Sequence, residues 1–108
     1  MDTIKIEDIQ ALCNARKIIW SSHCAQRLIK RNIPKADVKN ALLNGEIIEQ
    51  YPTDYPYPSC LVLGLTLKQL YLHVVGAIGN EALFMITAYY PNRDKWMPDF
   101  KTRKEQKQ

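Results

Sequence analysis

The 108-residue sequence has no apolar run that approaches the roughly 18 residues that a membrane-spanning helix needs. Its first eight residues carry three acids, where a signal peptide would have a basic region followed by an apolar stretch. Hydrophobic residues make up 46% and charged residues 24%, which excludes a globally disordered chain. We therefore expect a cytoplasmic globular protein that has room for one core and no contact with membranes.

Cysteine is also scarce. Cys13, Cys24 and Cys60 cannot all pair within one chain, and none belongs to a C-x-x-C motif. This usage excludes a disulfide scaffold and a structural zinc site, and it predicts three buried thiols. The sequence also lacks H-x-x-x-H, D-x-D and glycine-rich phosphate-binding motifs. We therefore expect no metal site and no cofactor, so that any hydrolysis would be metal-independent.

Helical spacing of apolar residues dominates the N-terminal half of the chain. It predicts three helices, over residues 4–15, 22–31 and 34–43. Ser21 or Ser22 is a suitable N-cap for the second helix, and Pro34 suits the first turn of the third. Gly45 should end the third helix by taking the left-handed conformation.

The C-terminal half has the composition of β-strands. Four strands are predicted, over residues 46–51, 60–67, 70–78 and 82–90. Residues 16–20 should form a connection or a short extended piece, and the proline-rich residues 51–59 a loop. The last connections are hairpin-short, which favours antiparallel pairing. The expected fold is α+β, with N-terminal helices packed on an antiparallel sheet of about four strands. Residues 1–100 should form this single domain, and residues 101–108 a basic polar tail that frays.

Charge is unevenly distributed along the chain. Residues 9–36 contain no acid and six cations, namely Arg16, Lys17, Arg27, Lys30, Arg31 and Lys35. A solvated surface without a ligand usually mixes both signs. The pattern therefore favours an anionic partner such as the phosphate backbone of RNA.

The second predicted helix carries the residues best suited to chemistry. On a helical wheel, His23, Arg27, Lys30 and Arg31 fall within an arc of about 100°, opposite the apolar residues. The positive end of the helix dipole favours a neutral imidazole at His23, which can accept a proton. Cleavage of RNA needs an acid and a base, together with cations where negative charge accumulates. We therefore predict His23 as general base or acid, and Arg27 and Arg31 as the phosphate clamp.

Other candidate site residues lie in the predicted strands. His73 is the second histidine of the chain, and its side chain should share a face with Tyr71 and Val75. If that face points toward the second helix, His73 and His23 can meet across a cleft; otherwise His73 is a buried histidine that serves the structure. Tyr89 could stack a base or act as the second catalytic group, and Arg93 could hold a phosphate.

Several stretches together resemble a small bacterial family of domains of unknown function, numbered 4258. They are Ser21–Arg31, Ile33-Pro34, Gly45–Tyr51, Pro56–Leu63, Leu72–Val75 and Thr87–Tyr89. The resemblance implies a fold like that of the RelE, barnase, EndoU and colicin group of ribonuclease toxins, and a zinc-finger antitoxin as protein partner. It also implies functional roles for its motif positions, which here are His23, Arg27, Arg31, His73, Thr87 and Tyr89.

Residues and resemblance together predict a metal-independent endoribonuclease of toxin–antitoxin type. His23, Arg27, Arg31, His73 and Tyr89 are the predicted catalytic residues. Lys30, Thr87 and Arg93 are predicted to bind RNA. The alternative is a non-catalytic module that uses the same basic helix to bind nucleic acid or an acidic protein.

Overall fold

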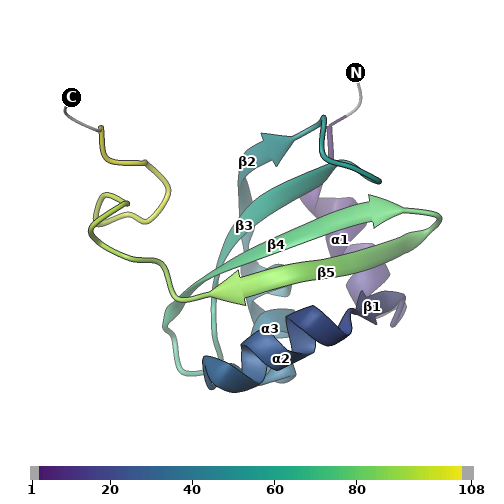
Figure 1. Ribbon diagram of the computed structural model, residues 1–108, viewed down its shortest axis with the longest axis horizontal. Helices are drawn as coiled ribbons and strands as arrows, with labels where there is room; N and C mark the ends of the chain where they lie inside the picture. The colour runs from purple at the N-terminus through teal and green to yellow at the C-terminus, as the bar shows by residue number, and fades with distance from the viewer. Residues whose placement is uncertain (1–2, 106–108) are drawn as a thin grey trace.

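A computed structural model describes residues 3–105 of the chain (Figure 1). Its elements follow one another in the order α1 (Ile6–Asn14), β1 (Ile18–Trp20), α2 (Ser22–Lys30), α3 (Lys35–Asn44), β2 (Glu46–Tyr51), β3 (Ser59–Leu65), β4 (Tyr71–Gly79) and β5 (Ala82–Tyr89). None of these helices is long and apolar enough to cross a membrane.

The strands form one mixed sheet in the order β1-β5-β4-β3-β2. The pairs β2–β3, β3–β4 and β4–β5 are antiparallel, as the short connections predict. The α+β class, with N-terminal helices on a sheet, is therefore confirmed. The sheet has one strand more than expected, because residues 18–20 form β1 and pair in parallel with β5. Three residues without alternation carry too little pattern to distinguish a strand from a connection.

The helix boundaries follow from local chemistry. The Ser21 hydroxyl accepts a hydrogen bond from the backbone N–H of Cys24 at 3.0 Å, which makes Ser21 the N-cap of α2. Pro34 is the N-cap of α3, one position before its first turn. The prediction of a left-handed Gly45 is wrong, because its φ is −90° and its ψ is 177°. Glycine is needed there for space, since a Cβ would overlap the carbonyl oxygen of Ala41.

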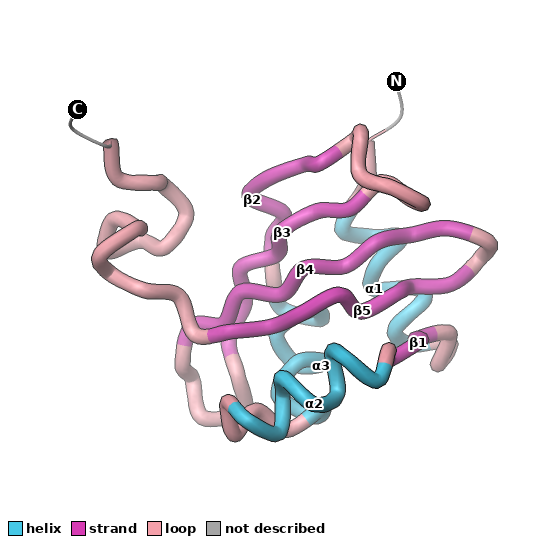
Figure 2. Tube along the Cα trace, in the orientation of Figure 1, coloured by secondary structure: helices cyan, strands magenta, loops and turns pink. Residues whose placement is uncertain are grey.

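The two faces of the sheet differ in what covers them. The helices pack on one face, and Figure 2 shows α1 and α3 behind the strands. The core lies between, and its fully buried residues include Ile9, Leu28, Val38, Leu42, Val62, Val74, Leu83 and Met85. The three cysteines are free and buried, as predicted. We call the opposite face, which no helix covers, the open face; it carries Leu61, Leu63, His73, Val75, Phe84 and Tyr89.

Residues 91–105, here called the C-terminal segment, leave β5 and fold back beside the sheet (Figure 1). Phe100 packs against Tyr71 on the open face. Trp96 is 3% exposed and pairs with Arg103 in an isolated bridge. Lys101 forms an ion pair of 2.8 Å with Glu46. The expectation of a fraying tail is therefore wrong for residues 101–105, whereas residues 106–108 lie outside the described part of the chain.

The contact between β3 and α3 gives a direct test of this packing. A Cβ added at Gly64 would overlap the backbone of Ala41, which cannot move aside as a flexible side chain can. We expect Gly64→Ala to lower the free energy of unfolding by about 3 kcal/mol or more, at the upper end of overpacking costs. Urea unfolding followed by circular dichroism measures this effect.

Gly76→Ala is the matched control. There the added Cβ would lie 3.2 Å from the end of the flexible Leu83 side chain. We expect Gly76→Ala to lower the free energy of unfolding by at most half as much as Gly64→Ala does. Equal losses in the two variants would contradict the close approach of α3 to β3.

Candidate functional site

A group of titratable side chains gathers on the open face. Glu49 and Tyr51 come from β2, His73 from β4, Tyr89 from β5 and Arg103 from the C-terminal segment. Register explains the gathering: Glu49 lies opposite Leu61 in β3, and His73 lies opposite both Leu63 and Tyr89. Opposed residues of neighbouring strands share one face. We call these five residues the open-face cluster.

A forked ion pair forms the centre of the cluster. The Nε of Arg103 donates to Oε2 of Glu49 at 2.7 Å, and its Nη2 donates to Oε1 at 3.0 Å. The guanidinium also lies 4.5 Å from the centroid of the Trp96 ring, and the Tyr51 hydroxyl donates to Oε1 of Glu49. The hydrogen bonds from Arg103 are the main cause that lowers the pKa of Glu49. Glu49 is therefore an ionised carboxylate at neutral pH.

The two tyrosines of the cluster are held in their neutral form. Burial and the hydrogen bond to Glu49 raise the pKa of Tyr51 to about 12. Burial also raises the pKa of Tyr89, against the opposing influence of the Arg103 and Arg31 charges. Both phenols are therefore O–H donors at neutral pH. Tyr89 lies close enough to both arginines to be affected by either charge.

His73 is completely buried beneath the C-terminal segment. Its Nε2 lies 2.8 Å from the carbonyl oxygen of Phe100, so Nε2 carries the proton and donates it. The ring meets those of Trp96 and Tyr89 edge-on, at centroid distances of 4.6 and 5.4 Å. Burial lowers the pKa of His73, and its Nδ1 has no hydrogen-bond partner among the described residues. His73 thus positions the C-terminal segment as a neutral imidazole.

The hypothesis that the two histidines share a cleft is not supported. The face of β4 that carries His73 points away from the helices, so the condition for a meeting with His23 fails. The alternative, a buried histidine, describes His73, although the C-terminal segment covers it and not a helix. His23 and Arg27 are exposed on α2. The role predicted for His23 as general base or acid therefore stays a prediction, without His73 as its partner.

Arg31 connects α2 to the open face. Its Nη1 donates to the hydroxyl of Thr87 at 2.9 Å and to the carbonyl oxygen of Ala88 at 2.8 Å. His23, Arg27 and Arg31 repeat every four residues, so they form one stripe along α2, which we call the α2 stripe. The stripe is about 12 Å long. The helix that carries the stripe lies beside β5 in Figure 1.

The remaining predicted RNA contacts lie near the Arg31 end of this stripe. Arg31 lines a hollow of about 400 Å³ together with Lys68 and Tyr90. Lys30 is exposed at the end of α2, and Arg93 is exposed in the turn that follows β5. The structure thus brings together Arg31, Thr87, Tyr89 and His73, and it leaves His23, Arg27, Lys30 and Arg93 exposed around them.

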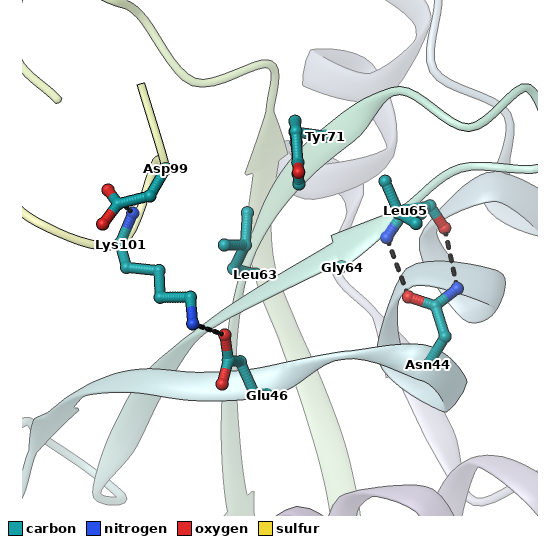
Figure 3. A pocket seen from close by; sticks show the side chains of 8 residues that line it. All are labelled: Asn44, Glu46, Leu63, Gly64, Leu65, Tyr71, Asp99 and Lys101. Carbon is teal, nitrogen blue, oxygen red and sulfur yellow. Dashed lines mark hydrogen bonds and ion pairs between the residues drawn. The ribbon is translucent and has the colours of Figure 1, made fainter. Parts of the chain in front are cut away.

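A second hollow, of about 390 Å³, lies between the C-terminal segment and the start of β4 (Figure 3). Its polar groups already have partners. Lys101 binds Glu46, and the side-chain amide of Asn44 binds the backbone N–H and C=O of Leu65. We therefore interpret this hollow as a structural junction. Among residues 3–105, no three His, Cys, Asp or Glu side chains gather closely enough to hold a metal ion.

Sequence reasoning missed Glu49, Tyr51, Trp96 and Arg103. One signal was available, because Glu49 and Tyr51 alternate along an edge strand and must therefore share a face. The partner Arg103 lies 54 residues away in the stretch expected to fray, and no local pattern connects the two positions.

Comparison with known proteins places the chain in a family. The sequence profile of the family described as "Domain of unknown function (DUF4258)" matches residues 20–90. The protein belongs to this family. No curated protein and no solved structure matches the chain. The matched residues include the α2 stripe and all of the open-face cluster except Arg103.

The buried imidazole predicts a pH dependence of stability. Because burial lowers the pKa of His73 in the folded state, the unfolded chain binds more protons between that value and about 6.5. Stability is therefore lost as the pH falls through this window. We expect the free energy of unfolding to decrease less steeply from pH 7.5 to pH 5 in His73→Gln, whose amide can still donate to Phe100. Urea unfolding at several pH values measures the slope, and an unchanged slope would contradict a neutral buried His73.

Proposed function

We propose that this protein is an endoribonuclease that cleaves RNA without a metal ion, by attack of a 2′-hydroxyl on the adjacent phosphodiester. One observation carries the proposal: an ionised carboxylate, two neutral phenols and an arginine gather on a sheet face that no helix covers. Titratable groups with shifted pKa values cluster at functional sites. When the pKa values of two neighbouring groups are shifted in opposite directions, one group can act as the acid and the other as the base.

Glu49 is the proposed general base. Its carboxylate accepts the 2′-hydroxyl proton, the 2′-oxygen bonds to phosphorus, and the bond to the 5′-oxygen breaks. The products are a 2′,3′-cyclic phosphate and a free 5′-hydroxyl. Tyr89 is the proposed acid that protonates the leaving 5′-oxygen. Solvent water then takes the proton from Glu49 and returns a proton to the Tyr89 phenolate, which restores both groups.

Arg103 is proposed to stabilise negative charge beside this general base. Its Nε and Nη2 are directed at Glu49, and a guanidinium has five N–H donors, more than these two hydrogen bonds use. A donor of this kind stabilises the negative charge that builds on the phosphoryl oxygens in the transition state. The guanidinium therefore serves both the base and the phosphate.

The α2 stripe is the proposed path of the RNA backbone. His23 and Arg27 are exposed, and no acid lies between residues 9 and 36. Cations of this kind bind phosphates without sequence preference and steer the approach of RNA. The hollow at Arg31, with Lys68 and Tyr90, continues the path toward Tyr89.

The biological setting implied by the family resemblance is a cytoplasmic toxin that a zinc-finger antitoxin restrains. We propose such a protein as the partner. It would block cleavage by covering the open-face cluster, because that face is the one the helices leave accessible to a second protein.

A non-catalytic RNA-binding module is the second candidate. The specific observation in its favour is that His23 and Arg27 are exposed on α2, as expected of a docking surface. The two candidates differ in their products, because only the enzyme generates RNA ends with a cyclic phosphate.

The role of Glu49 can be tested with a closely matched control. We expect Glu49→Gln to slow RNA cleavage at least 100-fold while RNA affinity is kept, because the amide cannot accept the proton. The assay incubates purified protein with total RNA in a chelator and detects cyclic phosphate ends.

Glu46→Gln is the control, since Glu46 lies on the same strand and also forms an ion pair with the C-terminal segment. It should cleave at nearly the parental rate. Equal activity of both variants and the parent would refute Glu49 as the base. If all three proteins, the parent included, generate no cyclic phosphate ends, the binding module is favoured.

Substitutions in the α2 stripe should change the affinity for RNA more than the rate of cleavage. We expect Arg27→Glu to weaken RNA affinity about tenfold or more in low salt and to make affinity less dependent on salt, since one phosphate contact is lost. His23→Ala should retain cleavage within a few-fold of the parent at saturating RNA. Fluorescence anisotropy at several salt concentrations measures binding. If His23→Ala abolishes cleavage while binding is intact, the reacting groups lie on α2 and not on the open face.

A further inference from the structure

A third hollow, of about 380 Å³, lies on the open face away from the C-terminal segment. The loop between β2 and β3 forms one wall with Asp54, Tyr55 and Tyr57. Ala77 of β4 and Phe84 of β5 form the other. Neither the α2 stripe nor the open-face cluster contributes to its lining. The volume is within the range of small-molecule sites.

Aromatic rings dominate this hollow. The ring of Tyr57 stacks on that of Phe84, with a centroid distance of 5.2 Å and an angle of 25° between the planes. Tyr55 is 95% exposed, which is unusual for a side chain that could bury so much apolar surface. Exposed aromatic rings are surfaces on which the bases of single-stranded nucleic acids can stack.

One polar group is fixed at the edge of the hollow. The hydroxyl of the fully buried Ser59 donates to Oδ2 of Asp54, which holds the carboxylate in one orientation. An ionised carboxylate only accepts hydrogen bonds, and each oxygen has more than one acceptor position. The edge of the hollow therefore matches a flat ligand that presents N–H donors.

The hollow lies on the same face of the sheet as the open-face cluster. Tyr51 lies opposite Ser59, and Ser59 lies opposite Ala77, which lines the hollow. Glu49 lies on the same face two residues before Tyr51, about 7 Å along β2. A nucleotide whose sugar is at the cluster could therefore place its base in the hollow.

We propose that the hollow binds a nucleobase of the RNA, and specifically guanine. The N1–H and N2–H groups of guanine lie side by side and can both donate to Asp54, whereas the Watson–Crick edges of adenine, cytosine and uracil each carry a single donor group. The ring stacks on Tyr55 and on the Tyr57–Phe84 pair. This inference rests on the proposed function, because it assigns the base preference of the same open-face site.

Free nucleosides test the hollow without any cleavage. Guanosine and adenosine are titrated into the ¹⁵N-labelled protein, and amide shifts of Ala77 and Phe84 report binding. We expect guanosine to bind at least tenfold more tightly than adenosine. Asp54→Asn should reduce this preference to less than threefold, and Tyr55→Ala should weaken both nucleosides at least fivefold. Asp8→Asn, the same charge change in α1 on the opposite side of the sheet, is the control and should alter neither.

Failure of this inference is distinguishable from failure of the proposed function. Glu49→Gln should bind guanosine as the parent does, since this variant keeps the hollow and lacks only the proposed general base. The guanine site is refuted if guanosine causes no shift at Ala77 or Phe84, or if Asp54→Asn keeps the preference for guanosine over adenosine. The ribonuclease still stands in either case if RNA is cleaved in a Glu49-dependent manner. If guanosine binds and no RNA is cleaved, the site stands and the enzyme is refuted.

Discussion

The fork between Glu49 and Arg103 is the interaction on which the candidate site depends. It connects β2 to a segment with no helix or extended strand pairing of its own between residues 91 and 105. The Trp96 ring shields the guanidinium on one side, and the buried His73 holds the carbonyl of Phe100, three residues before Arg103. Two arginine hydrogen bonds to one carboxylate fix both partners in orientation, which a single lysine contact would not. The same contact therefore attaches the segment and keeps Glu49 ionised.

Burial produces the electrostatic character of the cluster. The C-terminal segment excludes water from His73 and half-buries Tyr51 and Tyr89, so each of these groups favours its neutral form. Glu49 is the exception because a full positive charge is directed at it. An ionised carboxylate beside neutral O–H donors therefore results from where the segment packs. The α2 stripe, which the segment does not cover, remains an exposed basic surface suited to binding.

Local patterns in the sequence were sufficient for much of the fold. The N-cap at Ser21, the start of β2 at Glu46 and the two hairpins follow from residues close together in the chain. Alternation in β4 also placed His73 on the face of Tyr71 and Val75 correctly. What covers that face could not be predicted, because Trp96, Phe100 and Arg103 reach it through contacts between residues 23 to 54 positions apart. Gly45 was assigned a conformational role, whereas its role is steric and depends on the approach of α3 to β3.

The central claim is that the scissile phosphate lies on the open face, between Glu49 and Arg103. The most direct measurement is a crystal structure of the protein with a short RNA that carries a 2′-deoxy sugar at the cleaved position, so that it binds without reacting. The account predicts a phosphate within hydrogen-bonding distance of the Arg103 guanidinium, with the 2′-carbon facing the Glu49 carboxylate. RNA bound only along α2, with the open face empty, would contradict it.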